Sequence, residues 1–421
     1  MISLRRQRKM YMDGLAGRKP LTPVSYADLE AKARTHMSHE GYTFVAGGAG
    51  REGTMEANRN ALDKIQIHPR MLGGVQEVRM QLPWREHTLP APFMLAPVGV
   101  LELAHPHGDL AEARACRATG VPMIISSQAS YPMEEIARHL GDCPRLFQLY
   151  HSKSRELSKS FIQRAEAIGC SALVITLDTT LLGWRVRDLS HGYNPFILGK
   201  GIAQYYSDPV FNSLPDAPRD PDVRPPITPE LIWNLIRLCQ RLPGGLLHNL
   251  AGGRGLKVTT KFTSVFSNPG IDWDEIERIR SWTKMPVYLK GILHVEDALK
   301  AAAIGVDGII VSNHGGRQVD GAVGSAEALA TILPAIKGKL EVWMDSGIRS
   351  GTDIFKCLAL GATGVMVGRP FIMALAANGE QGIIDCITNL LSELELDMAL
   401  SGCHQISDIN ENLISHPWKT I

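Results

Sequence analysis

The segment SNHGGRQVD, residues 312–320, holds residue types that could carry out acid–base chemistry. His314 follows an apolar run, and its imidazole can accept a proton near neutral pH. Arg317 comes three residues later, and its guanidinium can bind a carboxylate through two parallel hydrogen bonds. Gly315 and the next glycine let the backbone approach a ligand closely. A base beside a carboxylate-binding cation is what oxidation of a 2-hydroxy acid requires, whereas a lone histidine at a strand end is more often structural.

Two further segments, DSGIRSGTD and VMVGRP, have the character of a phosphate site. Gly347 and Gly368 leave backbone N–H groups accessible where a helix is expected to begin, and such groups stabilise an anion. Arg349 and Arg369 supply positive charge, and Asp345 opens the first segment. These residues predict phosphate binding, and the alternative is a pair of structural turns.

Other polar side chains also follow apolar runs. They are Gln148, Tyr150, Thr176, Asp178, Lys290 and Ser312. A ring of such groups is costly to bury without a polar ligand. Lys290 could neutralise a reduced cofactor, form a Schiff base or make a structural salt bridge, and its residue type does not choose among these. His105 and His107 have no carboxylate or cysteine to complete a metal site, so we expect no metal.

The elements that must position these residues form a regular series. Eight short apolar runs are each followed by a polar or glycine-rich turn and, in most cases, by a helical pattern. The runs cover residues 93–98, 122–126, 145–150, 172–178, 286–290, 308–313, 341–346 and 364–368. Runs that are apolar throughout are typical of strands buried on both faces. The series predicts an α/β fold, a (β/α)8 TIM barrel with function at the carboxyl ends of its strands, and a doubly wound sheet is the alternative.

The spacing is interrupted once, where residues 179–285 separate the fourth run from the fifth. We expect a long insertion here, about residues 190–270, at the carboxyl end of the barrel. Its part rich in proline and aspartate, residues 207–226, is predicted to bury little and to form a mobile lid, and a surface excursion without a role is the alternative. The chain is expected to form one domain, with an N-terminal helical segment (1–90), the barrel (91–377) and a C-terminal helical segment (378–421).

The composition argues against several classes of partner. The 421 residues carry a formal net charge of +1, so no overall field favours nucleic acid. No apolar run is long enough to span a membrane, and no secretory signal is evident. Seven cysteines occur without a CxxC pair, which favours reduced thiols over disulfides or zinc. We therefore expect a cytoplasmic protein with no nucleic-acid or membrane partner.

Taken together, these segments resemble the FMN-dependent α-hydroxy acid oxidases and dehydrogenases. The run SNHGGRQ is close to diagnostic of that family, and FQLY, ITLDT, LKGI, DSGIRSGTD and GRP follow its order within residues 22–405. The segments FVAGGAGREGT, ITLDTTLLGWRVRDLS and YYSDPVF, with Gly99, are most similar to its lactate 2-monooxygenase branch. The resemblance implies FMN as cofactor, a small L-2-hydroxy acid and dioxygen as reactants, and a homotetramer or homo-octamer.

The resemblance also implies roles for individual residues. His314 would be the catalytic base, oriented by Asp178, and Lys290 would stabilise negative charge on the reduced flavin. The substrate hydroxyl would contact Tyr150, and the carboxylate would bind Arg185 and Arg317. The cofactor-binding positions implied are Pro97, Val98, Gly99, Ser126, Gln148, Thr176, Lys290, Ser312, Gly315, Asp345, Gly347, Arg349, Gly368 and Arg369.

One position departs from the family pattern. Phe44 stands where the family has a tyrosine whose phenol binds the substrate carboxylate, and Tyr42 is not expected to replace it. One hydrogen bond to a charged group contributes about 1.5–3 kcal/mol. Its loss could weaken binding, favour a bulkier or less polar substrate, or accompany a loss of activity.

The hypothesis from the sequence is oxidation of an L-lactate-like 2-hydroxy acid. If the 2-oxo acid is released, the products are that acid and hydrogen peroxide. If it is retained, peroxide converts it to the shorter acid, carbon dioxide and water, and the resemblance favours this monooxygenase outcome. The alternatives are a simple oxidase or dehydrogenase, a weakly active or non-catalytic flavoprotein because of Phe44, and an FMN-barrel isomerase of isoprenoid diphosphates.

Overall fold

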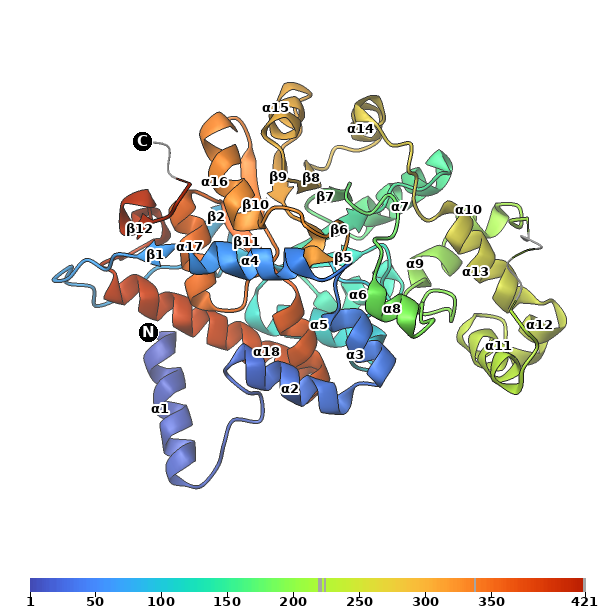
Figure 1. Ribbon diagram of the computed structural model, residues 1–421, viewed down its shortest axis with the longest axis horizontal. Helices are drawn as coiled ribbons and strands as arrows, with labels where there is room; N and C mark the ends of the chain where they lie inside the picture. The colour runs from blue at the N-terminus through green and yellow to red at the C-terminus, as the bar shows by residue number, and fades with distance from the viewer. Residues whose placement is uncertain (219–221, 223–224, 337, 419–421) are drawn as a thin grey trace.

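A closed barrel of eight parallel strands forms the centre of the protein in the computed structural model, which describes residues 1–218, 222, 225–336 and 338–418 (Figure 1). In chain order the strands are β4 (Phe93–Leu95), β5 (Met123–Ser126), β6 (Arg145–Leu149), β7 (Leu173–Thr176), β8 (Val287–Ile292), β9 (Gly308–Val311), β10 (Glu341–Met344) and β11 (Gly364–Val367). Strand β11 pairs with β4 and closes the barrel. The predicted (β/α)8 fold is therefore confirmed, and only β8 extends beyond the run predicted for it.

Helices connect consecutive strands and surround the barrel. They are α5 (Gly108–Thr119), α6 (Met133–Leu140), α7 (Arg155–Ala167), α14 (Trp273–Arg280), α15 (Val295–Ala303), α16 (Ser325–Ile336), α17 (Gly351–Leu360) and α18 (Arg369–Leu400). Short polar side chains fix where several of them begin, because they accept hydrogen bonds from backbone N–H groups of the first turn. Ser154 caps α7 in this way, and Ser350 caps α17.

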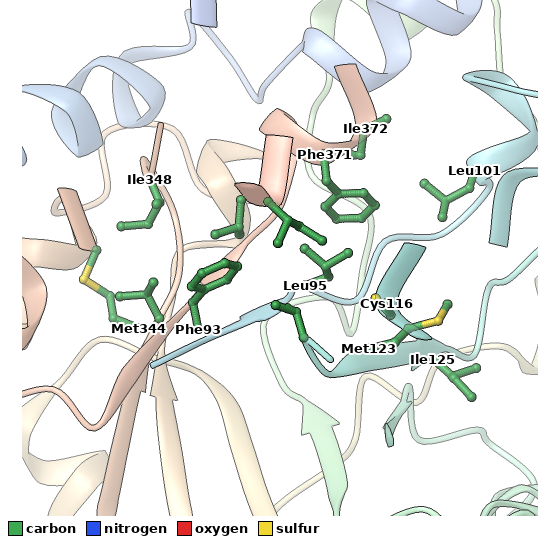
Figure 2. Close-up of a cluster of buried hydrophobic side chains, with 14 of the residues drawn as sticks. Phe93, Leu95, Leu101, Cys116, Met123, Ile125, Met344, Ile348, Phe371 and Ile372 are labelled. Carbon is green, nitrogen blue, oxygen red and sulfur yellow. The ribbon is translucent and has the colours of Figure 1, made fainter. Parts of the chain in front are cut away.

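The apolar character of the strands comes from burial on both faces. Inside the barrel, Leu146, Ile310 and Met366 belong to one cluster of buried side chains. Outside it, Figure 2 shows Phe93 of β4 near Phe371 of α18, within the second buried cluster. Successive residues of a strand point to opposite faces, so both sets must be apolar.

A hairpin that the sequence did not predict closes the amino end of the barrel. It is formed by β2 (Leu82–Trp84) and β3 (His87–Leu89). The Trp84 ring lies 6.2 Å from the Trp343 ring in an edge-on contact, and its indole nitrogen donates to Glu341 at 3.0 Å. Since Glu341 opens β10, this end of the barrel is filled with side chains.

The N-terminal helices pack around the carboxyl end and one side of the barrel. They are α1 (Ile2–Leu15), α2 (Tyr26–His36), α3 (His39–Ala46) and α4 (Gly53–Asp63). Helices α1 and α2 lie against the long helix α18, as Figure 1 shows, and α4 packs against α16. A short antiparallel pairing of β1 (Gln66–Ile67) with β12 (Ile414–Ser415) joins the segment before the barrel to the segment after it. The predicted N-terminal helical segment is thus present.

The long insertion after the fourth barrel strand is also present. It contains α8 (Val186–Ser190), α9 (Ala203–Tyr206), α10 (Pro209–Ser213), α11 (Pro229–Arg241), α12 (Leu246–Ala251) and α13 (Arg254–Val265), and the last three stand to one side of the barrel in Figure 1.

The expectation that residues 207–226 bury little is wrong for the first part of that segment. Phe211 is buried, and Asp208 is fully buried, where it caps α10 and accepts from Ser160 at 2.8 Å. The aspartate that suggested a solvated lid is therefore a structural cap. Residues 219–221, 223 and 224 of the segment lie outside the described residues.

Candidate active site

A cavity of about 1000 Å³, open to solvent, lies at the carboxyl end of the barrel. Concave sites of this kind are where cofactors and small ligands bind. Many predicted site residues line it together, namely Phe44, Pro97, Val98, Gly99, Tyr150, Arg185, Lys290, His314, Gly315, Arg317, Asp345, Gly347, Arg349, Gly368 and Arg369. The strand-end argument therefore placed most of these side chains in one site.

Five predicted residues do not line the cavity. They are Ser126, Gln148, Thr176, Asp178 and Ser312. The Gln148 amide donates to Thr176 Oγ1 at 3.0 Å and accepts from Ser126 Oγ at 3.3 Å, so three neighbouring strands are joined by one row of bonds. Ser312 Oγ accepts from the Lys290 ammonium at 2.9 Å. These side chains border the cavity through partners rather than by direct lining.

His314 and Asp178 form the pair predicted for acid–base chemistry. His314 Nδ1 lies 2.8 Å from Asp178 Oδ1. Because a carboxylate accepts at that distance, Nδ1 is assigned the proton, and Nε2 keeps a free lone pair. Burial lowers the pKa of His314 despite the opposing Asp178 charge. The pKa of Asp178 falls to about 2 because the His314 and Lys290 charges outweigh the effect of burial. The arrangement is a neutral imidazole held by an ionised carboxylate.

The backbone around His314 is in an unusual conformation. His314 has φ of 58°, in the left-handed region that β-carbons disfavour, and Ser346 has φ of 78°. Ser346 Oγ accepts from the Gly315 N–H at 2.9 Å and donates to Asp345 at 2.8 Å. Backbone strain of this kind persists where surrounding contacts enforce it, commonly at functional sites. Sequence reasoning missed Ser346, although it lies inside the DSGIRSG segment.

Lys290 is paired within the cavity wall. Its ammonium lies 2.9 Å from Asp345 Oδ2, and both side chains are almost fully buried. Burial lowers the pKa of Lys290, but the charges of Asp345 and Asp178 raise it by more than burial lowers it, so the pKa is raised overall. A lysine held in its charged form cannot act as a Schiff-base amine, which leaves charge stabilisation and the salt bridge from the alternatives that the sequence left open.

Three arginines at the cavity, one buried and two half-buried, have no carboxylate partner among the described residues. Arg185, Arg317 and Arg369 form no ion pair with a carboxylate in the described part of the chain. Arg317 donates to the backbone carbonyls of Phe44 and Gly47, and Arg369 donates to the Gly315 carbonyl at 2.8 Å.

Their pKa values reflect this uncompensated burial. Burial and neighbouring cations lower the pKa of Arg317 well below its usual range and that of Arg369 to about 10. Burial likewise lowers the pKa of Arg185. Uncompensated buried cations are expensive unless a ligand neutralises them, so this cavity is suited to an anion.

Phe44 lies between the two cations expected to bind a carboxylate. Its ring centroid is 4.9 Å from the Arg317 guanidinium carbon and 5.7 Å from that of Arg185. Two rings of the insertion, those of Tyr193 and Phe196, meet it edge-on. Position 44 therefore offers an aromatic face to the arginines instead of a phenol donor.

Tyr42 does not replace the missing phenol. Its hydroxyl donates to Glu30 at 3.3 Å, and Tyr42 is not part of the cavity wall. This agrees with what the sequence led us to expect of Tyr42.

Among the residues that were not predicted, Thr179 and Phe196 line the cavity and Gln318 lies beside it. Thr179 Oγ1 donates to Asp178 at 2.9 Å and lies 3.2 Å from His314 Nδ1. Gln318 accepts from Arg185 at 3.2 Å and donates to the Asp178 carbonyl. Their positions beside predicted residues could have suggested both. Phe196, which lines the cavity from the insertion, had no comparable signal in the sequence.

Glycines make room at the part of the cavity with phosphate-site character. A β-carbon at Gly315 would lie 2.7 Å from an Arg369 nitrogen, and Gly347 has φ of 90°. Arg349 and Arg369 line this part, and Arg369 begins α18. At the opposite part, a β-carbon at Gly99 would lie 2.9 Å from the β-carbon of Gln128. Close backbone approach and two cations at a helix start suit a phosphate group, which fits a phosphorylated cofactor.

The barrel, the cavity and its cations define a (β/α)8-barrel enzyme that binds an anionic ligand. Comparison with known proteins agrees. The model of the FMN-dependent dehydrogenase family matches residues 33–416. An L-lactate oxidase of Lysinibacillus sphaericus (strain C3-41) is 37% identical, with 92% of this chain and 91% of the relative covered. A 4-hydroxymandelate oxidase of Amycolatopsis orientalis is 37% identical, with 92% and 96% covered.

A solved structure supports the same grouping. The crystal structure of a mandelate oxidase with 3,3-difluoro-2-hydroxy-3-phenylpropionic acid has a TM-score of 0.73 and 36% identity, with 92% of this chain and 97% of that chain covered. The chain belongs to the FMN-dependent dehydrogenase family. It is an FMN-dependent oxidoreductase, and FMN is its cofactor.

Within the described residues, no helix is both long and apolar enough to cross a membrane. All seven cysteines are buried and free, as the absence of a CxxC pair suggested. Burial raises the pKa of the Cys143 thiol to about 11, which keeps it protonated and unreactive.

Proposed function

We propose that this chain oxidises a small L-2-hydroxy acid at the cavity, with dioxygen as electron acceptor. The observation that carries the proposal is a neutral His314, held by Asp178, beside Arg185 and Arg317, which have no carboxylate partner among the described residues. A base and a pair of cations that can bind a carboxylate are what a 2-hydroxy acid needs. The relatives named L-lactate oxidase and 4-hydroxymandelate oxidase support the same class of substrate.

Arg185 and Arg317 would bind the carboxylate and so fix the orientation of the substrate. Both have N–H groups directed to neutral carbonyl or amide oxygens, which a carboxylate can outcompete because charged hydrogen bonds are stronger. Tyr150 lines the same cavity, and burial raises its pKa, so its phenol stays protonated and can donate to the substrate hydroxyl. Fixing the acid at both groups leaves one orientation for the reacting carbon.

His314 would take the proton released in oxidation at its free Nε2 atom. The proton comes from the α-carbon or from the hydroxyl, and the geometry is compatible with either. The imidazolium that forms is stabilised by Asp178, 2.8 Å from Nδ1, and Thr179 donates to the same carboxylate oxygen. General-base catalysis of this kind accelerates a reaction by about 10²- to 10⁴-fold.

The residues of the cavity fit FMN. Arg349, Arg369 and Gly347 would hold its phosphate, and Pro97, Val98 and Gly99 would lie against the ring system. The Lys290 ammonium, kept charged by Asp345, would offset negative charge on the reduced ring. When bound, FMN supplies the acceptor for the two electrons that leave the substrate.

Ser126, Gln148 and Thr176 would support the ring edge through their bonded row, and Ser312 would do so through its bond to Lys290. The hydrogen bonds of that row join β5, β6 and β7. We retain these residues as cofactor-supporting positions, together with Gly315 and Gly368.

We further propose the monooxygenase outcome, in which the 2-oxo acid stays bound and is decarboxylated by peroxide to the shorter acid, carbon dioxide and water. Support comes from the segments that resemble the lactate 2-monooxygenase branch and from Phe196 and Leu182, which add apolar side chains to the cavity wall from the insertion and its preceding loop. The alternative is release of the 2-oxo acid and peroxide.

The first test is reduction without oxygen. Addition of L-lactate to the purified yellow protein should bleach the flavin absorbance, and D-lactate should not. If no L-2-hydroxy acid in a panel that includes lactate and mandelate bleaches it, the oxidation proposal is wrong and a non-catalytic flavoprotein remains. After readmission of air, acetate indicates retention and pyruvate indicates release.

A second test addresses retention directly. Deletion of residues 207–226 would remove the buried Asp208 and Phe211, so a point substitution is cleaner. Phe196→Ala should shift the product from acetate towards pyruvate, whereas the exposed Leu189→Ala in the same insertion should not. An unchanged acetate yield in Phe196→Ala contradicts the role given to the insertion.

The single-domain organisation, the homotetramer or homo-octamer and the cytoplasmic location stay predictions from the sequence. Gel filtration with light scattering would test the oligomeric state.

A further inference from the structure

Tyr26, at the start of α2, stacks against a cavity arginine that the mechanism assigns to the phosphate. The guanidinium carbon of Arg349 lies 4.3 Å from the centroid of the Tyr26 ring. This is the shortest cation–ring distance in the part of the chain that the structure describes. Tyr26 lies before residue 33, where the match to the family model begins, and it is not itself part of the cavity wall.

Arg349 has few other contacts to fix its side chain. Its Nη1 atom donates to the carbonyl of the preceding residue, Ile348, at 2.8 Å. The Arg349 guanidinium forms no ion pair with a carboxylate of the described residues. Asp353 accepts a hydrogen bond from the backbone N–H of Arg349, but its ion pair is with Arg59. A long side chain with one local hydrogen bond keeps much of its rotamer freedom. The ring of Tyr26 is therefore the main feature that sets the plane of the guanidinium.

The ring is itself held on a well-anchored element. Ser25 caps α2 by accepting from the Asp28 N–H, and Leu29 and Ala33, three and seven residues after Tyr26 and so on the same face of the helix, are buried. Thr22, just before the helix, is buried and donates to Asp385 of α18 at 2.8 Å. Since α18 also begins with Arg369, both cations of the phosphate region are tied to one packed unit.

The charge state of the ring supports stacking rather than ion pairing. Burial raises the pKa of Tyr26, while the charge of Arg349 and a hydrogen-bond interaction with its side chain act in the opposite direction, so the phenol remains neutral. A neutral ring attracts a guanidinium through its face, and the attraction is stronger where water is excluded. Tyr26 thus leaves the edge of the guanidinium free to donate into the cavity.

We propose that Tyr26 is a positioning residue for the cofactor, which holds the Arg349 guanidinium in the plane that binds the FMN phosphate. The inference rests on the proposed placement of the phosphate at Arg349 and Arg369. This role would make the N-terminal segment contribute to cofactor retention through Tyr26, which does not itself line the cavity.

The chain provides a matched control. Tyr42 stacks on Arg34 at 5.6 Å in the same N-terminal region, away from the cavity. The experiment compares wild type, Tyr26→Phe, Tyr26→Leu, Tyr42→Leu, Arg349→Ala and the double variant Tyr26→Leu/Arg349→Ala as apoproteins. Each is titrated with FMN and with riboflavin, which lacks the phosphate, and the dissociation constants and apoprotein melting temperatures are measured.

Tyr26→Leu should weaken FMN binding by about 5- to 30-fold and leave riboflavin binding unchanged. Tyr26→Phe, which keeps the ring, and Tyr42→Leu should bind FMN within about twofold of wild type. In the Arg349→Ala background, Tyr26→Leu should cause no further loss.

Other results overturn the inference. Equal FMN affinity in Tyr26→Leu and wild type removes any role for the ring. Equal loss of FMN and riboflavin, or equal loss in Tyr42→Leu, shows a structural role that does not act through the phosphate. If Tyr26→Leu does not fold, Tyr26→Phe is measured alone and in the Arg349→Ala background. A large loss of FMN affinity in Tyr26→Phe alone, together with additive effects of the two changes in the double variant, would also contradict stacking. Failure of wild type to bind FMN would instead overturn the proposed site, so the two failures are distinguishable.

Discussion

Both ends of the barrel hold arginines that are at least partly shielded from water, but the two ends differ in the groups that these arginines pair with. At the amino end, Arg85 lies 3.1 Å from Glu341 and 3.4 Å from Asp307, and it donates to the Tyr288 hydroxyl. At the carboxyl end, Arg185 and Arg317 donate to neutral oxygens, and neither forms an ion pair with a carboxylate in the part of the chain that the structure describes. One end compensates its charge within the protein, and the other leaves the charge for a ligand.

The comparison shows what distinguishes a functional arginine from a structural one. Burial alone does not, since both ends are partly or fully shielded from water. The distinguishing feature that we propose is the absence of a carboxylate partner among the described residues, because unpaired buried charge is costly and often marks a functional site. This difference should separate the effects of mutation at the two ends.

The largest effect is expected at the base. His314→Gln removes the proton acceptor and should slow flavin reduction by L-2-hydroxy acids by about 10²- to 10⁴-fold. FMN content and melting temperature should stay close to wild type, because the side chain makes its main bond to Asp178 alone. Stopped-flow absorbance measures the rate, and a variant reduced at near wild-type speed contradicts the assignment of the base.

A change of Arg317 should sharpen the contrast between the ends. Arg317→Met removes a charged hydrogen bond to the substrate and should lower kcat/KM by about 10- to 150-fold. The free energy of unfolding of the apoprotein should not fall, because the variant removes a buried cation without a carboxylate partner. A marked fall in stability with unchanged kinetics would identify Arg317 as structural.

The matching change at the other end is Arg85→Met. It leaves Glu341 and Asp307 without their cation and should lower the free energy of unfolding by about 1–3 kcal/mol. FMN affinity and reduction rate should be unchanged, because Arg85 is at the end remote from the cavity. Denaturant unfolding and FMN titration test this, and a selective loss of FMN would break the comparison.

Phe44 offers a smaller, opposite test. Phe44→Tyr adds a phenol between Arg185 and Arg317 and should lower the KM for a small 2-hydroxy acid by about tenfold. The stacked arginines should keep their positions, because the ring that they contact is retained. Steady-state kinetics with lactate and mandelate would measure the change. An unchanged KM for both substrates would show that the missing phenol at position 44 does not weaken substrate binding.

The pH profile should show the smallest effect. The base acts when neutral, and burial lowers the pKa of His314 below the ordinary value of a histidine, about 6.5, so kcat/KM should rise with pH and level off at a lower pH than an unperturbed imidazole would give. Asp178→Asn removes a charge that raises this pKa, so its plateau should begin at lower pH and at a lower rate. A wild-type inflection above pH 6.5 would contradict the assignment.

Much of the barrel and the site was predictable because the signals are local. Each barrel strand is a short apolar run, and a residue that follows such a run must lie at the carboxyl end once the barrel closes. His314, Arg317, Arg349 and Lys290 were located in this way. Gln148 and Ser312 were also assigned to the strand ends, but the structure places them behind the wall, because the direction of a side chain depends on its partners across neighbouring strands.

Other features could not be derived from local signals. The hairpin at Trp84 has a short and mixed sequence, and only the aromatic interior of the barrel gives it a place to pack. The solvated lid expected at residues 207–226 was wrong at its start, because Asp208 finds buried partners on α7.

The sequence by itself determined the eight-strand barrel, and it predicted the base with its neighbouring cation and the phosphate segment, since apolar periodicity and motif spacing act within a few residues. The tertiary structure alone decided which charges find partners. Arg317 meets the Phe44 carbonyl across a separation of 273 residues, and Tyr26 meets Arg349 from a helix packed on α18. Charge compensation is a property of groups brought together by folding, so no local pattern encodes it.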